Sequence, residues 1–124
     1  MKFGLFASLC VLVPASALAQ SMNAEQYYQR AKALQDKGML AIFSSGEIKA
    51  LTSEAQGAAR QAAENRRVAM KAGKPPRFCP PPGSFKMNDK EFMADLGALP
   101  AADRAHIDMT EAMTRIFIAK FPCR

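Results

Sequence analysis

The chain has 124 residues, of which 17 are lysine or arginine, 11 are acidic and one is histidine, and its formal net charge is +6 at pH 7. Outside the apolar N-terminal stretch the chain has one histidine and two cysteines, too few ligands for a good zinc site, and neither a glycine-rich phosphate loop nor a serine-centred nucleophile elbow occurs. These features argue against the common enzyme classes, so we expect a protein that is not an enzyme and holds no metal or cofactor.

The start of the chain has the pattern of a secretory signal peptide. Lys2 gives a positive n-region, an apolar run extends from Phe3 to Val13, and Ala17-Leu18-Ala19 forms a small-x-small cleavage site. The run is too short for a transmembrane helix, which needs about 20 residues. Cys10 lies inside it after a large residue, which disfavours lipid attachment. We therefore expect cleavage after Ala19, export to the periplasm, and a single helical domain over residues 20–124 that does not insert into the membrane.

Helical periodicity dominates the remaining chain, and no convincing alternating strand occurs. Asn23 is placed to cap a first helix that runs to about Lys37 and ends at Gly38. The apolar segment Met39–Phe43 follows as either a helical turn or a buried connector. The apolar residues of the first helix recur at helical spacing: Ala24, Tyr27, Tyr28, Ala31 and Leu34.

A long, alanine-rich second helix is predicted from Glu47 or Ser53 to Ala72. Alanine has a high helix propensity, and small side chains allow a neighbouring helix to approach closely. The inner stripe of this helix is expected to consist of Leu51, Ala55, Ala58, Ala59, Ala62, Ala69 and Met70.

The proline-rich segment Gly73–Lys86 is the longest predicted loop, and its prolines favour a stiff, extended path. Asn88–Glu91 has the outline of a capping box and opens a short helix that runs to about Ala98. Pro100 marks the first turn of the last predicted helix, which runs to about Lys120. Its inward residues are expected to be Ala105, Met109, Ala112, Met113, Ile116 and Phe117. The predicted fold class is therefore all-α, a small single-domain bundle of about four helices.

Cys79 and Cys123 are the two cysteines downstream of the leader. Two thiols in an exported chain normally oxidise. An antiparallel hairpin of the last two helices would return Cys123 to the side where the shorter helix begins, within reach of the loop that carries Cys79. We predict that the two cysteines form one disulfide.

We expect structural rather than catalytic roles for the histidine and for the acidic residues of the C-terminal half. His106, the single histidine, has no free thiol to pair with once the disulfide forms, so we expect a surface or half-buried position for it. The acidic residues of the C-terminal half resemble helix caps and solvated faces rather than a catalytic pair. They are Asp89, Glu91, Asp95, Asp103, Asp108 and Glu111.

Basic residues gather around the end of the second helix: Arg60, Arg66, Arg67, Lys71, Lys74 and Arg77. Only Glu64 lies among them, so the local formal charge is +5. Export argues against a nucleic-acid partner, which leaves an anionic lipid surface, an acidic protein partner or a solvated helix face. The solvated helix face is the default interpretation, and a protein contact is the alternative, because arginine and aromatic residues adjoin on a stiff loop. The predicted partner-binding residues are Arg66, Arg67, Lys71, Lys74, Arg77, Phe78 and Phe85.

The C-terminal half resembles the Rap/Tai-type immunity proteins, small exported helical proteins that neutralise peptidoglycan-amidase toxins delivered by type VI secretion. The resemblance covers roughly residues 77–124, and the front half lacks the family's additional cysteine and its Gly-Tyr-Ile-type segment. The residues that carry it are Phe78-Cys79-Pro80, Phe92-Met93-Ala94-Asp95-Leu96, Pro100, Ala112-Met113 and Phe121-Pro122-Cys123. It implies an all-α fold, the Cys79–Cys123 bridge, a toxin as protein partner and a homodimer.

We therefore expect an exported, non-catalytic binding protein that occludes the active site of a peptidoglycan-amidase toxin. The alternative is a general periplasmic envelope protein, such as a stress chaperone or an assembly factor, because small helical acid-stress chaperones share the size and the single disulfide. No toxin-contacting residue can be transferred from the family, so Gly73–Lys86 and the adjoining basic face are the contact surface predicted on physical grounds.

Overall fold

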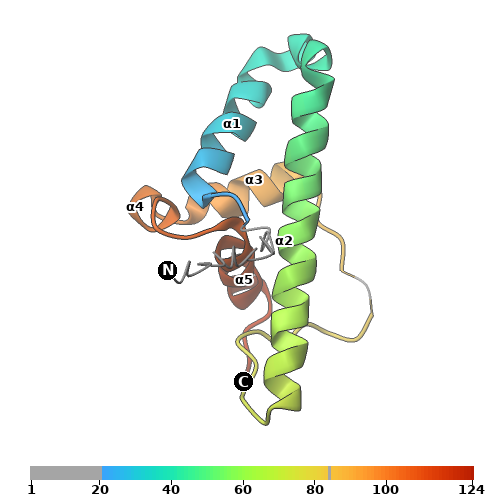
Figure 1. Ribbon diagram of the computed structural model, residues 1–124, viewed down its shortest axis with the longest axis vertical. Helices are drawn as coiled ribbons and strands as arrows, with labels where there is room; N and C mark the ends of the chain where they lie inside the picture. Colours follow the sequence, from blue (N-terminus) through green and yellow to red (C-terminus); the bar gives the residue numbers. More distant parts are fainter. Residues whose placement is uncertain (1–20, 84) are drawn as a thin grey trace, which may run out of the picture.

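The computed structural model describes residues 21–83 and 85–124. The predicted leader, with Cys10 and the cleavage site after Ala19, lies outside the described residues. The described chain is all-α, as predicted (Figure 1). Its elements are α1 (Ala24–Lys37), the 3-10 helix η1 (Gly38–Ser44), α2 (Ser45–Lys71), α3 (Asp89–Ala98), α4 (Ala101–Arg104) and α5 (Met109–Lys120). None of the described helices combines the length and apolar character needed to cross a membrane.

The helices begin where the sequence supplies a cap. Asn23 accepts a hydrogen bond from the Gln26 amide at 3.1 Å and opens α1, and Asn88 accepts one from the Glu91 amide at 2.8 Å and opens α3. Each bond satisfies an amide that has no partner within its helix. Gly38, with φ of 55°, ends α1 as predicted.

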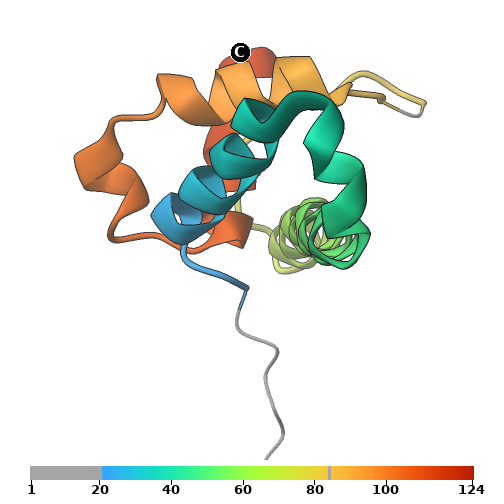
Figure 2. The ribbon, with the colours of Figure 1, turned by 90° about the horizontal axis from the view of Figure 1, so that it is seen from above.

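The core lies where α2 packs against α5, with α1 and α3 closing its sides. Ala58 and Ala62 of α2 are 2% and 1% exposed and allow α5 to approach closely. The largest fully buried side chains are Leu96, Met109 and Ile116. From the η1 connection α1 and α2 diverge, and Figure 2 shows α2 almost along its axis, standing beside the other helices.

The prediction of one continuous final helix is wrong. The chain breaks after α4, and Asp108 begins α5 by accepting a hydrogen bond from the Glu111 amide at 2.8 Å. The break is stabilised by the N-terminal segment, because the Ala24 amide donates to the Ile107 carbonyl at 2.9 Å and the Met109 amide to the Met22 carbonyl at 2.7 Å. In a continuous helix, the Ile107 carbonyl and the Met109 amide would bond to other residues of the same helix.

Three smaller expectations also need correction. Ala105, predicted to face inward, is exposed because it lies in the break between α4 and α5. Met70, predicted for the inner stripe of α2, is 49% exposed near the end of that helix. Helix α2 begins earlier than predicted, at Ser45, and has 27 residues, because η1 leads into it directly.

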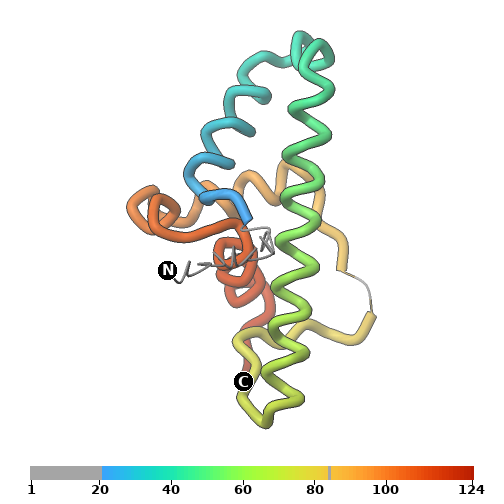
Figure 3. Tube along the Cα trace, viewed as in Figure 1, coloured from blue at the N-terminus to red at the C-terminus, as the bar shows by residue number. Residues whose placement is uncertain are grey.

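The predicted disulfide joins Cys79 to Cys123 with an Sγ–Sγ distance of 2.05 Å. The Cys79 amide also donates to the Phe121 carbonyl at 2.7 Å, so backbone and side chain join the same two segments. Figure 3 shows the C-terminus lying beside the loop that follows α2. The bridge therefore fastens this loop to the end of α5.

Candidate functional site

The predicted partner-binding residues separate into three groups in the structure. Arg66, Arg77 and Phe78 line a polar hollow between α2 and α5. Arg67, Lys71 and Lys74 lie exposed at the end of α2. Phe85 lines a separate apolar groove and is 41% exposed. The seven residues therefore do not form one surface.

Phe78 belongs to the core rather than to an exposed contact surface, since only 4% of it is exposed. Its ring packs on Phe117, with 5.2 Å between ring centroids. Arg66 covers it from outside, because its Nε donates to the Phe78 carbonyl at 2.8 Å and its guanidinium lies 5.8 Å from the ring centroid. The predicted direct contact through Phe78 therefore needs correction, and Arg66 has a structural role that sequence analysis did not foresee.

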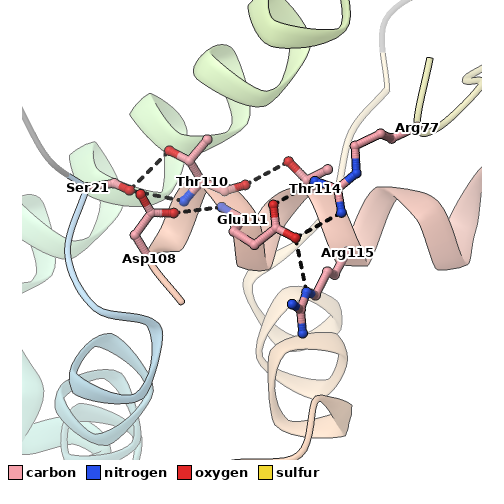
Figure 4. A network of polar contacts seen from close by, with 7 residues as sticks. All are labelled: Ser21, Arg77, Asp108, Thr110, Glu111, Thr114 and Arg115. Atoms are coloured by element: carbon pink, nitrogen blue, oxygen red, sulfur yellow. Dashed lines mark hydrogen bonds and ion pairs between the residues drawn. The ribbon is translucent and has the colours of Figure 1, made fainter. Parts of the chain in front are cut away.

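Glu111 is the centre of the polar network in Figure 4. The guanidinium of Arg77 donates two hydrogen bonds to its carboxylate, at 2.7 and 2.9 Å, and Arg115 Nε donates a third at 3.1 Å. These bonds, that from Arg77 above all, hold the pKa of the Glu111 carboxyl below its usual range. Arg77 thereby joins the loop after α2 to the first turn of α5.

The polar hollow has a volume of about 350 Å³, and several of the polar groups that line it bond to other groups of the protein. Asp108 caps α5, and the Thr114 hydroxyl donates to the Thr110 carbonyl at 2.8 Å. The Thr110 amide and hydroxyl both bond to the Ser21 hydroxyl at 3.1 Å, as Figure 4 shows. Across the described part of the chain, no hydroxyl or thiol hydrogen-bonds to a histidine or a carboxylate. The arrangement suits a structural joint and offers no activated nucleophile.

The remaining titratable residues also fill structural positions. His106 is exposed in the break before α5, and its amide donates to the Asp103 carbonyl at 3.0 Å. Glu91 and Asp95 both bind the ammonium group of Lys120, at 2.5 and 3.1 Å, which joins α3 to α5. Within the described ranges, no three His, Cys, Asp or Glu side chains lie close enough together to hold a metal ion.

An apolar groove of about 660 Å³ opens between α1, α2 and α3. Most of its lining is aliphatic or aromatic, with three methionines, Met87, Met93 and Met113, among the lining residues. Tyr27 lies at its base, where its hydroxyl donates to the Leu51 carbonyl at 3.1 Å, and burial raises the pKa of Tyr27 to about 12. The volume lies in the range of sites that bind ligands or side chains of a partner.

The strongest exposed apolar feature is the η1 connection between α1 and α2. The exposed fractions of its large side chains are 89% for Met39, 65% for Leu40, 70% for Ile42 and 82% for Phe43. We call these four residues the apolar tip. A helical turn was one of the two predictions for this segment, and the other, a buried connector, is wrong. The tip lies at the end of the molecule where α1 meets α2 (Figure 1).

The sequence indicates the short apolar segment that forms the tip, but not whether this segment is buried. Met39–Phe43 is a run of five apolar residues between Gly38 and a Ser-Ser-Gly break, and it is too short to form a helix with an inner and an outer face. Burial depends on whether another element covers the segment, which the local pattern does not record.

Comparison with models of known protein families, with curated proteins and with solved structures found no match. The likeness of residues 77–124 to the Rap/Tai-type immunity proteins therefore remains a hypothesis that rests on the motifs of this chain.

Proposed function

We propose that this protein is an exported, non-catalytic binding protein whose apolar tip and apolar groove engage a protein partner. The observation that carries the proposal is the exposure of Met39, Leu40, Ile42 and Phe43, all at 65% or above. Single exposed apolar residues are common on soluble proteins, but a contiguous cluster of large ones marks an interaction surface.

The groove extends this surface along the same pair of helices. Ile48, which follows the tip in α2, lines the groove and is 41% exposed, and Phe85 enters it from the predicted contact loop. Methionine side chains adapt their shape to a partner at low cost. A convex apolar tip beside a concave apolar groove gives a partner two complementary points of attachment.

The immunity role is the specific form of this proposal. It is supported by the resemblance over residues 77–124 and by the disulfide, which would keep a small exported domain rigid. In this role the tip enters or covers the cleft of a peptidoglycan-amidase toxin in the periplasm and excludes its substrate. A rigid surface suits such occlusion, because little conformational entropy is lost on binding.

A second candidate, a periplasmic stress chaperone or assembly factor, is favoured by the open groove and its methionines. An apolar surface of this kind accepts varied unfolded segments without a fixed geometry. Dye binding distinguishes the candidates, because an acid-stress chaperone exposes additional apolar surface on acidification, whereas an immunity protein keeps the same exposed area.

The decisive experiment is a pulldown with the oxidised protein, residues 20–124, from envelope and secreted fractions, analysed by mass spectrometry. The test variant carries Ile42→Ser and Phe43→Ser. The matched control carries Val68→Ser and Met70→Ser, which removes exposed apolar groups (53% and 49%) from another part of the molecule. We expect the test variant to lose the partner and the control to retain it.

Stoichiometric recovery of a peptidoglycan amidase, lost in the tip variant, supports the immunity role. A broad set of unfolded envelope proteins supports the chaperone instead. Recovery of the protein's own second copy alone, with the tip variant monomeric, would assign the tip to the predicted homodimer. Equal capture by wild type and tip variant would contradict the proposed surface.

A further inference from the structure

The outer side of α2 carries a row of cations that the proposed partner surface does not use. Arg60, Arg67 and Lys71 lie seven and four positions apart, which places them on one face of the helix, and Lys74 follows just past its end. We call these four residues the basic stripe. All four are exposed, whereas Ala58 and Ala62 on the opposite face are buried in the core.

Most of the charge of the stripe is not neutralised within the described residues. Arg67 is paired with Glu64, at 2.9 Å from its Nε, but Arg60, Lys71 and Lys74 form no ion pair with any described residue. Arg66 and Arg77, by contrast, are engaged with Phe78 and Glu111. The positive charge therefore lies along the back of one helix, over about 16 Å from Arg60 to Lys71 at 1.5 Å per residue, and Lys74 follows past the helix end.

The shape of this surface suits a flat partner. The stripe runs along the convex back of a single helix, and Val68 and Met70, 53% and 49% exposed, flank it on either side. Helices with a basic face and adjoining apolar groups lie in the interface of anionic membranes. Each lysine or arginine held within a Debye length of such a surface adds to the attraction.

We propose that the basic stripe binds the surface of an anionic phospholipid bilayer, so that the protein is a peripheral membrane protein. Six residues of α2 line the apolar groove: Ile48, Leu51, Ala55 and Ala59 lie roughly 100–180° around the helix from Arg60, and only the polar Thr52 and Gln56 lie at the edge nearer the stripe. The groove thus stays accessible while the stripe contacts lipid. This inference does not rest on the proposed partner binding, since the two surfaces share no residue.

Vesicle co-sedimentation tests the inference directly. The probe is a phosphatidylcholine vesicle with about 30% phosphatidylglycerol, compared with pure phosphatidylcholine. The protein is the oxidised chain of residues 20–124, because the apolar leader would bind bilayers by itself. We expect binding to the anionic vesicles alone, and we expect it to fall at least about tenfold between 0.05 and 0.5 M salt as the Debye length shortens.

Paired charge reversals locate the contact. Arg60→Glu with Lys71→Glu is expected to weaken binding at least about tenfold, since two cations become anions at the membrane surface. Lys32→Glu with Lys90→Glu makes the same change in net charge on exposed positions of α1 and α3, and should alter binding less than about threefold. If the first pair unfolds the protein, Arg60→Gln with Lys71→Gln and the matching glutamine control replace it.

Four results would overturn the proposal. They are absence of binding to anionic vesicles, equal binding to neutral vesicles, equal loss in both charge-reversed pairs, and an acidic protein in the pulldown whose capture needs the stripe while vesicles do not bind. Equal binding to neutral vesicles would show that apolar side chains, rather than the charges of the stripe, hold the protein on lipid. The pulldown with the tip variant tests the proposed partner binding in a separate experiment. Failure of vesicle binding therefore does not count against the proposed function.

Discussion

Arg104 and Glu25 form an ion pair across 79 positions of the sequence, with Arg104 Nε 2.6 Å from Glu25 Oε2. The Arg104 side chain is only 6% exposed, and its guanidinium lies 4.1 Å from the centroid of the Tyr28 ring. Its Nη1 also donates to the carbonyl of Leu99 and, at 3.3 Å, to those of Leu96 and Gly97. Arg104 thus donates to carbonyl groups at the C-terminal end of α3, and its ion pair with Glu25 joins α4 to α1.

We expect Arg104→Met to lower the free energy of unfolding by about 3 kcal/mol, because buried carbonyls lose their donor. Arg104→Lys should recover less than half of the loss, since a lysine has no planar fork to reach several acceptors. Urea unfolding measures both. Arg115→Met, at a residue 37% exposed, is the control and should cost less than about 1 kcal/mol. An equal effect at both positions would contradict the role assigned to Arg104.

The disulfide should be a large part of the stability of this small domain. Cys79 and Cys123 are separated by 44 positions, and closing a loop of that length stabilises the folded state by about 4 kcal/mol in the chain-entropy model. We expect the double variant Cys79→Ala, Cys123→Ala to show this loss in urea unfolding. Dithiothreitol should produce the same loss in the wild type and none in the variant. Unchanged unfolding midpoints after reduction would contradict the prediction.

Acid should weaken the joint between Arg77 and Glu111. The folded pKa of Glu111 lies below the reference value of 4.5, mainly because Arg77 donates to the carboxylate. The stability gained from this carboxylate is therefore complete above about pH 4.5 and is lost as the pH falls through the lower folded pKa. In an NMR titration, Arg77→Gln should raise the pKa of Glu111 toward 4.5.

Arg67→Gln is the matched control for that titration. Arg67 donates to Glu64 and lowers the pKa of Glu64, so its substitution should raise the pKa of Glu64 and leave Glu111 unchanged. If each substitution shifts the pKa of only its own partner carboxyl, local hydrogen bonds are the cause of the lowered pKa values. A parallel shift of both carboxyl groups in either variant would instead indicate a general effect of net charge.

The apolar tip should contribute little to folding. Ile42→Ser with Phe43→Ser removes side chains that are 70% and 82% exposed, so we expect a change in unfolding free energy within about 0.5 kcal/mol. Leu96→Ala, at a fully buried position, should cost about 3 kcal/mol. A homodimer through the tip would make stability rise with protein concentration. Sedimentation and unfolding at several concentrations therefore test the predicted homodimer at the same time.

Local sequence signals determined the helical elements of this protein. Asn23 and Asn88 cap the helices for which they were predicted, and Gly38 ends the first one. These outcomes depend on groups within a few residues of one another, which a sequence pattern records. The disulfide was predictable for another reason, since only two cysteines lie beyond the predicted leader and both lie in the described part of the chain.

The tertiary structure alone decided the break before α5, the burial of Phe78 and the exposure of the tip. The break depends on backbone bonds from residues 107–109 to residues 22–24, and Phe78 is buried because Phe117 and Arg66 cover it. The tip is exposed because no described element lies over it. Each outcome depends on partners distant in sequence, whereas periodicity and capping patterns report only on neighbours along the chain.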